Sequence, residues 1–186
     1  LTLNPTIEDD FIDKDFDKFV SRTKNRPLAS DKLSSIEAFI FAIGLIFTAF
    51  LLVLTTNVLT IQLSFVAFIL ASIYPFLKRY TYLPQIFLGL TFGWSIPMVF
   101  AATTNSIPQI AWLLLVANIL WAVVYDSEYA MIDREDDLKL GLRSSAILFG
   151  DMDRLMIGVL QLFFLFAQYL VWIIAELHWP FLIGII

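Results

Sequence analysis

Long apolar runs separated by short polar segments make up most of the chain. Five runs are long enough to cross the roughly 30 Å of hydrocarbon in a bilayer as α-helices. They cover Ile36–Thr55, Val58–Leu77, Leu83–Ala102, Pro108–Tyr125 and Met156–Ala175. These runs are too long for barrel strands and lack the alternation of such strands. The pattern therefore predicts an all-α fold, a polytopic bundle of transmembrane helices.

The two ends of the chain depart from this pattern. Leu1–Ser35 is polar and rich in charge, so we expect it outside the hydrocarbon, with Ser34 or Ser35 as the N-cap of the first span. Trp179–Ile186 is apolar but too short to cross, and it predicts a truncated sixth span. We interpret residues 1–186 as a single membrane-embedded domain that is incomplete at both ends.

Several residues inside the spans bear on helix packing. Gly89 and Gly93 form a small-xxx-small pair, which favours close contact with a neighbouring helix. Pro84 and Pro97 should bend or break their helix, because proline lacks the backbone N–H. Five amides at membrane depth should face the interior of the bundle, where they would bond other helices or contact a substrate: Gln62, Gln85, Asn118, Gln161 and Gln168.

Composition supports a membrane protein and excludes several kinds of site. The chain is 59% hydrophobic and only 16% charged, with a mean hydropathy of +0.80. It contains no cysteine, which excludes disulfides, zinc–thiolate sites and thiol catalysis. His178 is its only histidine, which argues against a histidine metal site or a Ser/His/Asp triad. The clustering of the acids, without a basic patch, gives no support to nucleic-acid binding.

All twelve Lys and Arg residues fall on one side of the predicted bundle. Six precede the first span, two follow the second span and four follow the fourth. Because basic residues accumulate in cytoplasmic loops, this side is predicted to be the cytoplasm, or the matrix of a mitochondrion.

A dense group of carboxylates follows the fourth span, in the sequence YDSEYAMIDREDDLKLGLR. Asp126, Asp133 and Asp137 stand at i, i+7 and i+11, which on a helix places them within about 40° of one face. Like charges at i and i+4 destabilise an isolated helix by about 0.2–0.5 kcal/mol, so a bound cation would relieve this acidic face. Ligands that are all oxygen indicate Mg²⁺.

A second acidic group lies near the N-terminus, where Asp10, Asp13 and Asp17 share a helical face at i, i+3 and i+7. Four spans separate the two groups, and an even number of crossings returns the chain to the same side. Two hard-cation sites that face each other could hold a diphosphate between them, since Mg²⁺ commonly completes its shell with phosphate oxygens. The alternative is that both groups are solvated acidic loops.

At this point the chain resembles the UbiA-type membrane prenyltransferases, most closely their 4-hydroxybenzoate polyprenyltransferase branch. The first motif of the family, N-D-x-x-D-x-x-x-D, falls on residues 9–17, with Asp9 in place of the asparagine. The second, D-x-x-Y-A-x-x-D-x-x-D-D, falls on residues 126–137. Between them lies KRYTYLPQIFLGLTFGWSIPMVFAA, residues 78–102, which is typical of the 4-hydroxybenzoate branch.

This resemblance implies Mg²⁺-dependent transfer of a polyprenyl group from its diphosphate to the ring of 4-hydroxybenzoate, in ubiquinone biosynthesis. It implies an integral protein of the bacterial or mitochondrial inner membrane and no protein partner. The metal ligands expected are Asp10, Asp13, Asp17, Asp133 and Asp137. The residues expected to be catalytic are Asp13, Asp17, Asp133, Asp137 and Arg79. The residues expected at the substrates are Arg79, Tyr129, Lys139, Arg143 and Asn118.

Among these residues, Arg79 is the candidate for the carboxylate of the aromatic substrate, because a guanidinium can hold a carboxylate in a bidentate pair. Its alternative role is a positively charged anchor at the membrane surface. Lys139 and Arg143 are candidate charge partners of the leaving diphosphate. Tyr129 is a candidate for hydrogen bonding to a metal ligand.

Three other functions are weighed against this one. A prenyltransferase of the same superfamily with another aromatic or quinone-precursor acceptor would share the acidic motifs but not the stretch at residues 78–102. A membrane CDP-alcohol phosphotransferase would need a D-G-x-x-A-R motif, which the chain lacks. A cation transporter would need acids near the middle of the bilayer, whereas these acids lie at the ends of the predicted spans.

Overall fold

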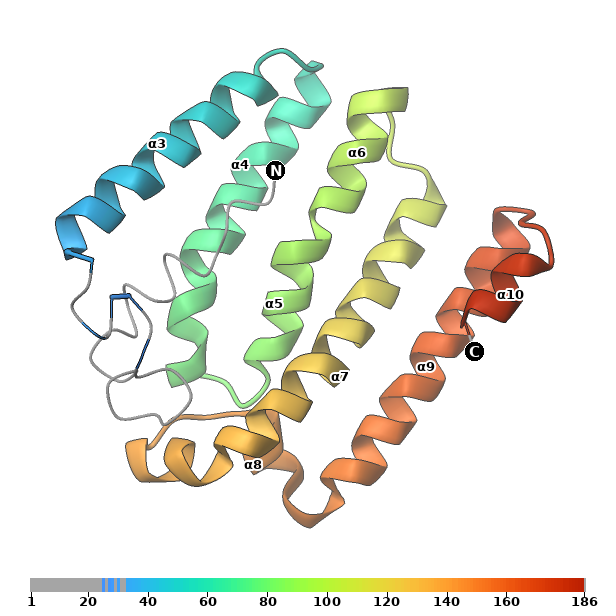
Figure 1. Ribbon diagram of the computed structural model, residues 1–186. Helices are drawn as coiled ribbons and strands as arrows, with labels where there is room; N and C mark the ends of the chain where they lie inside the picture. The colour runs from blue at the N-terminus through green and yellow to red at the C-terminus, as the bar shows by residue number, and fades with distance from the viewer. Residues whose placement is uncertain (1–24, 26, 29, 31–32, 186) are drawn as a thin grey trace.

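The computed structural model describes residues 25, 27, 28, 30 and 33–185. Within this part of the chain every regular element is a helix. Five segments are long and apolar enough to cross a membrane: Ser35–Val53, Val58–Leu77, Pro84–Thr104, Gln109–Lys139 and Ser145–Ile174. Figure 1 shows the long helices side by side in chain order. The predicted all-α bundle with about five spans is confirmed.

The spans are built from the following elements. In chain order these are α3 (Ser35–Val53), α4 (Val58–Ile73), the 3₁₀-helix η1 (Tyr74–Arg79), α5 (Pro84–Gly93), α6 (Ser95–Thr104), α7 (Gln109–Leu140), α8 (Ser145–Phe149), the 3₁₀-helix η2 (Gly150–Met152), α9 (Asp153–Ile174) and α10 (Pro180–Ile185).

Side-chain caps define the start of the first two spans. Ser34 begins α3 with a capping box: its Oγ accepts from the Glu37 N–H at 3.2 Å, and the Glu37 carboxylate accepts from the Ser34 N–H at 3.0 Å. The predicted cap is thus Ser34. Asn57 begins α4 by accepting from the Thr60 N–H at 3.0 Å, and its Nδ2 donates to the carbonyl oxygen of Ala101 at 2.5 Å. This bond brings the turn after α3 and the end of α6 to the same end of the bundle.

The third span is interrupted, as Pro97 predicts, whereas Pro84 is the first residue of α5 and breaks no helix. Pro97 has no N–H to donate to the carbonyl of Gly93, and the helix breaks at Trp94 between α5 and α6. The indole Nε1 of Trp94 donates to the carbonyl oxygen of Leu63 on α4 at 3.1 Å. The break therefore turns a tryptophan toward the neighbouring span, where it bonds the backbone.

Helix α7 is longer than the span predicted from hydropathy. The apolar run ends at Tyr125, but the helix continues for 32 residues in all, until Gly141 adopts a φ of 68°. At about 1.5 Å per residue it is roughly 48 Å long, well beyond the hydrocarbon thickness. The residues after Tyr125 include many good helix formers and no glycine or proline before Gly141. The second acidic motif is therefore the helical extension of the fourth span.

Helix α7 packs closely against α5 and against α9. These two pairs make the most extensive contacts between described helices. A Cβ at Gly89 would lie 2.8 Å from the Cα of Ile119, and one at Gly93 would lie 2.6 Å from Cδ1 of Leu115. Asn118 donates its Nδ2 to the carbonyl oxygen of Gly89 at 2.9 Å. The predicted small-residue contact is thus confirmed, with a polar bond beside it.

The predicted interior placement of the other amides has a mixed outcome. Gln85 is buried and Gln168 is half-buried, whereas Gln62 and Gln161 are exposed in the described part of the chain. The latter two lie on faces of α4 and α9 that no described helix covers. Hydropathy alone does not distinguish these faces, since α4 and α9 are apolar on most sides.

The opposite end of the bundle gathers several segments that are distant in sequence. Figure 1 shows the end of α4, the start of α5, the last turns of α7, the short α8 and the start of α9 together at the bottom. Nη1 of Arg143 donates to the carbonyl oxygen of Tyr80 at 2.7 Å, which fastens the loop after α7 to the loop after η1. Two of the basic segments predicted to share one side therefore do share one end.

Candidate functional site

The acidic end of α7 is the centre of the candidate site. Asp126, Asp133 and Asp137 are half-buried, whereas Glu128 and Glu135 on the same helix are exposed. This difference follows the predicted stripe, because the three aspartates share one face of the helix. Partial burial strengthens the field that a carboxylate exerts on a nearby cation.

The described residues do not form a metal site by themselves. No group of three His, Cys, Asp or Glu side chains within the described ranges lies close enough to hold a metal ion. The other predicted ligands, Asp10, Asp13 and Asp17, lie outside the described residues. The predicted ligand set, which combines both acidic motifs, therefore stays a prediction.

Basic side chains surround this acidic end. Nζ of Lys139 lies 3.3 Å from Oδ1 of Asp136, in an exposed i, i+3 pair. The guanidinium of Arg143 lies over the ring of Tyr82, 5.1 Å from its centroid, while it also bonds Tyr80. Arg143 therefore holds the residue 80–82 loop beside the acidic end, and Arg79 ends η1 one residue before this loop.

An aromatic row leads along α7 toward the acids. Trp121, Tyr125 and Tyr129 follow one another at i, i+4 and i+8, with ring centroids 6.4 Å and 5.1 Å apart. The hydroxyls of Tyr125 and Tyr129 lie 3.2 Å apart. Trp121 also contacts Phe164 on α9, with ring centroids 5.4 Å apart. Tyr129 was a predicted site residue, but Trp121 and Tyr125 were missed, although their spacing of four signals a shared face.

Two polar links on another face fasten the acidic part of α7 to the segments that follow it. Oγ of Ser127 and Oγ of Ser145 on α8 lie 2.6 Å apart, and both residues are buried. Arg134 forms an ion pair with Asp153 at the start of α9. The partners are separated by 18 and 19 residues, so the sequence pattern offered no signal for either link.

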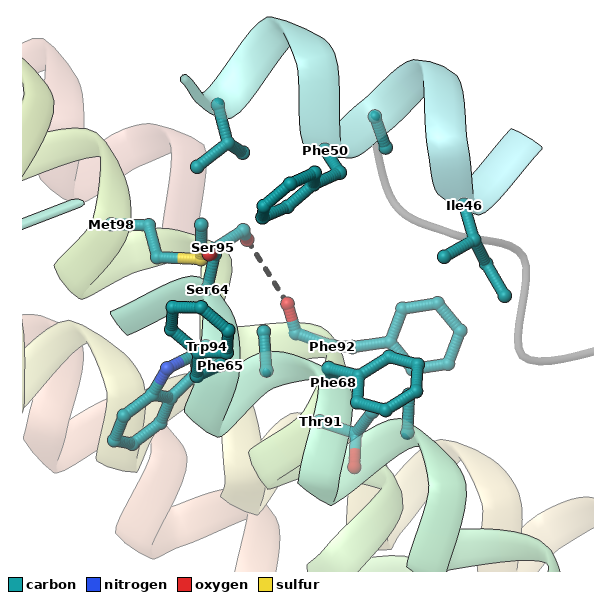
Figure 2. Close-up of a pocket in the computed structure, with 14 residues that line it drawn as sticks. Ile46, Phe50, Ser64, Phe65, Phe68, Thr91, Phe92, Trp94, Ser95 and Met98 are labelled. Atoms are coloured by element: carbon teal, nitrogen blue, oxygen red, sulfur yellow. Dashed lines mark hydrogen bonds between the residues drawn. The ribbon is translucent and has the colours of Figure 1, made fainter. Parts of the chain in front are cut away.

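Two apolar spaces open between the helices. Figure 2 shows one of about 390 Å³ between α3, α4 and the α5–α6 span, with Phe50, Phe65, Trp94 and Met98 turned toward it. Its hydroxyls bond the backbone of their own spans; the Oγ of Ser95, for example, donates across the break between α5 and α6 to the carbonyl oxygen of Phe92 at 3.0 Å. An open hollow of about 700 Å³ lies between α6, α7, α9 and α10. Its lining includes Asn118, Trp121, Phe164 and Gln168.

Solved structures share this arrangement of helices. The apo structure of a UbiA homolog from Aeropyrum pernix K1 aligns with a TM-score of 0.86 at 23% identity, over 97% of this chain and 69% of that one. The structure of a UbiA homolog from Archaeoglobus fulgidus bound to GPP and Mg²⁺ aligns with a TM-score of 0.74 at 15% identity, over 97% and 65%. At these identities the comparison establishes the fold.

Sequence relatives are closer. A 4-hydroxybenzoate octaprenyltransferase of Enterobacter sp. (strain 638) is 53% identical over 94% of this chain and 61% of its own length. The enzyme of the same name from Alcanivorax borkumensis is 55% identical over 95% of this chain and 61% of its own length. The chain thus spans about 61% of the length of these relatives. The model of the UbiA prenyltransferase family matches residues 6–186. The chain belongs to the UbiA prenyltransferase family.

Proposed function

We infer that the intact protein transfers a polyprenyl group from polyprenyl diphosphate to the aromatic ring of 4-hydroxybenzoate. The observation that carries this proposal is the second acidic motif, Asp126 to Asp137, borne on the membrane-proximal extension of α7 beside the residue 80–82 loop. Relatives named 4-hydroxybenzoate octaprenyltransferase, at 53% and 55% identity, support the choice of substrates. Their names make an octaprenyl donor the first one to test.

The chemistry of the residues on α7 fits Mg²⁺, because aspartate oxygens are the ligands that this ion prefers. We assign Asp133 and Asp137 as ligands from α7, with Asp10, Asp13 and Asp17 completing the site from the other side. A UbiA homolog bound to GPP and Mg²⁺ supports this assignment at the level of the fold. When bound, Mg²⁺ would neutralise the charge that develops on the leaving diphosphate.

The basic rim assists the same step. Lys139 lies on the last turn of α7, and its ion pair with Asp136 is exposed and therefore weak, so its ammonium can turn to the departing diphosphate as a charge partner. Arg143 already bonds Tyr80, so we assign it both to the leaving group and to holding the residue 80–82 loop. As the C–O bond to diphosphate breaks, the prenyl group becomes an allylic cation. The ring carbon ortho to the phenol hydroxyl attacks this cation, and the same carbon then loses its proton.

We propose that the acceptor is held near the residue 80–82 loop. Arg79 precedes the clamped loop, and we assign its guanidinium to the carboxylate of 4-hydroxybenzoate. Tyr129, which pairs with Tyr125, is placed one turn from Asp133 and supports that ligand. Asn118 lines the larger hollow while it bonds Gly89, so its contact with substrate would use its remaining amide groups.

The membrane supplies the donor. Five helices suited to crossing a bilayer make this an integral membrane protein. The apolar spaces between the helices suit a prenyl chain, since the hydroxyls that line the smaller one bond the backbone. The concentration of Lys and Arg at the acidic end supports our proposal that this end faces the cytoplasm from a bacterial inner membrane, within reach of soluble 4-hydroxybenzoate.

An acceptor comparison tests this proposal. The intact protein in proteoliposomes is given octaprenyl diphosphate, Mg²⁺ and one of several acceptors: 4-hydroxybenzoate, a phenol without a carboxylate, or a naphthoate. We expect prenylation of 4-hydroxybenzoate to exceed that of the phenol by at least about 10²-fold, since the phenol leaves the proposed guanidinium of Arg79 without a carboxylate partner. The naphthoate keeps a carboxylate, so it tests which ring the site accepts. Prenylation of another acceptor in preference would assign the protein to a different branch of the superfamily.

A further inference from the structure

Arg134 interrupts the second acidic motif with a positive charge. It directly follows Asp133 and stands three residues before Asp137, so a cation here would weaken a metal site if its guanidinium pointed at the same space. At about 100° per residue, Arg134 lies about 80° from the middle of the acidic face. Its guanidinium donates instead to the carboxylate of Asp153, the first residue of α9.

This ion pair is largely removed from solvent. The side chains of Arg134 and Asp153 are 28% and 12% exposed, whereas those of the Lys139–Asp136 pair on the last turns of α7 are 71% and 28% exposed. Asp153 also accepts from the N–H of Arg154 at 2.6 Å, at a helix N-terminus that favours negative charge. A partly buried pair of this kind leaves an uncompensated charge when one partner is removed.

The pair is one of two polar links on the same face of α7, Ser127–Ser145 and Arg134–Asp153, which together we call the seam. Ser127 lies seven residues before Arg134, so both occupy one face of the helix. Ser127 meets Ser145 of α8, and Arg134 meets Asp153 of α9. Rotation of the acidic part of α7 about its own axis would break both links. The seam therefore fixes the direction in which the aspartate face points.

Metal sites are sensitive to such a rotation. Mg²⁺ demands near-ideal geometry with ligands at about 2.0–2.1 Å. Groups that form a site must be held within roughly 0.5 Å and 10–20° of the productive arrangement. An ion pair one residue from Asp133 is well placed to hold it within these limits.

We propose that Arg134 and Asp153 are a positioning pair, which fixes the rotation of the acidic part of α7 so that Asp133 and Asp137 present their oxygens to Mg²⁺ and diphosphate. This proposal rests on the metal–diphosphate site of the proposed function and does not depend on which acceptor is prenylated. The pair touches neither substrate nor metal, and acts through the helix that carries the ligands.

The test measures metal affinity without turnover. The intact protein is titrated with Mn²⁺, a paramagnetic substitute for Mg²⁺, in the presence of inorganic diphosphate, and free Mn²⁺ is followed by electron paramagnetic resonance. The variants are Arg134→Gln, Asp153→Asn and the double variant Arg134→Gln/Asp153→Asn. Matched controls are Arg154→Gln and Asp151→Asn, which make the same chemical changes at exposed positions within two residues of Asp153.

Each single variant should weaken Mn²⁺ binding about 10- to 100-fold, the usual effect of removing a residue that orients a metal ligand. The double variant should bind better than the product of the two single losses predicts, because neither charge is left unpaired. Arg134→Lys, which keeps the charge, should recover part of the affinity. The controls should stay within about twofold of the unchanged protein.

Thermal melting of each variant separates positioning from general stability. Variants that melt at a lower temperature yet bind Mn²⁺ with unchanged affinity would overturn the proposal, since the pair would then be structural only. Equal losses in the variants and in their matched controls would overturn it as well. If the unchanged protein binds Mn²⁺ and diphosphate but prenylates no 4-hydroxybenzoate, the proposed acceptor is wrong, while the affinities still decide the role of the pair.

Discussion

The charged residues of the second acidic motif differ in their exposure and in their partners. On α7, Asp133 and Asp137 are half-buried on one face, Glu135 is exposed between them, and Arg134 is paired away from them. Neighbouring charged residues of one motif thus have different environments, because each residue turns the side chain by about 100°. Roles that look alike in the sequence can therefore be tested one residue at a time.

Asp137→Asn should lower kcat in the intact protein by about 10²–10³-fold, as expected when a main electrostatic contact to the transition state is lost. The change keeps the size of the side chain but removes one negative charge from the proposed metal site. Steady-state kinetics at saturating substrates measure it. A loss of less than tenfold, with normal Mg²⁺ dependence, would argue that Asp137 is a solvated surface residue.

Arg79→Ala should raise the KM for 4-hydroxybenzoate and leave the Mg²⁺ dependence unchanged, because it removes the proposed partner of the carboxylate. The control is an acceptor analogue without the carboxylate, which should lose little further activity in the variant. If the analogue is weakened as much as 4-hydroxybenzoate, Arg79 serves instead as a membrane anchor or a ligand of the diphosphate.

Among the helices, α7 holds a central place because it packs closely against α5. Gly89 and Gly93 allow the backbones to approach, and Asn118 bonds the carbonyl oxygen of Gly89 across the contact. Interfaces between membrane helices depend on such packing, since lipid provides no hydrophobic driving force between helices. The position of the acidic end of α7 relative to the residue 80–82 loop should depend on this contact.

Gly89→Val should destabilise the protein by about 1–3 kcal/mol through overpacking, because an added Cβ would lie 2.8 Å from the backbone of Ile119. Gly44→Val makes the same change on α3, where nothing lies within 4 Å of the added Cβ. Thermal melting in detergent compares the two. Equal melting temperatures for both variants would contradict the described contact between α5 and α7.

The elements themselves were largely predictable from the sequence, but their links were not. Hydropathy located the spans, and Pro97 predicted the break between α5 and α6. Hydropathy ended the fourth span at Tyr125, because it measures how apolar a segment is and does not report that a helix continues into a polar segment. The short helix α8 and the pair of Arg134 with Asp153 were missed, since they depend on packing between segments that are distant in sequence.

At the scale of the whole molecule, the bundle has two chemically distinct ends. One carries short turns without Lys or Arg, two of them joined by Asn57, and the other carries the acidic end of α7 and the loops bonded by Arg143. This asymmetry matches the positive-inside pattern and predicts which end faces the cytoplasm. The proposed metal site predicts that the first acidic motif, which lies outside the described residues, is on this same side.

Labelling of single cysteines tests this topology, and the absence of cysteine from the chain makes it straightforward. Cysteines replace Ser21, Thr104 and Asp151, the last two of which are exposed at opposite ends of the bundle. In oriented vesicles, an impermeant reagent should label positions 21 and 151 from the same side and position 104 from the other. Labelling of positions 21 and 151 from opposite sides would rule out a site shared by the two acidic motifs.

The acidic end of α7 is proposed to serve a Mg²⁺-dependent prenyl transfer. The most direct measurement follows both products in proteoliposomes that contain the intact protein, octaprenyl diphosphate and 4-hydroxybenzoate. Diphosphate and prenylated 4-hydroxybenzoate should appear in equal amounts, cease when EDTA removes Mg²⁺ and return when the ion is restored. Prenylation that continues at the same rate in EDTA, or movement of cations across the vesicle membrane without release of diphosphate, would contradict the account.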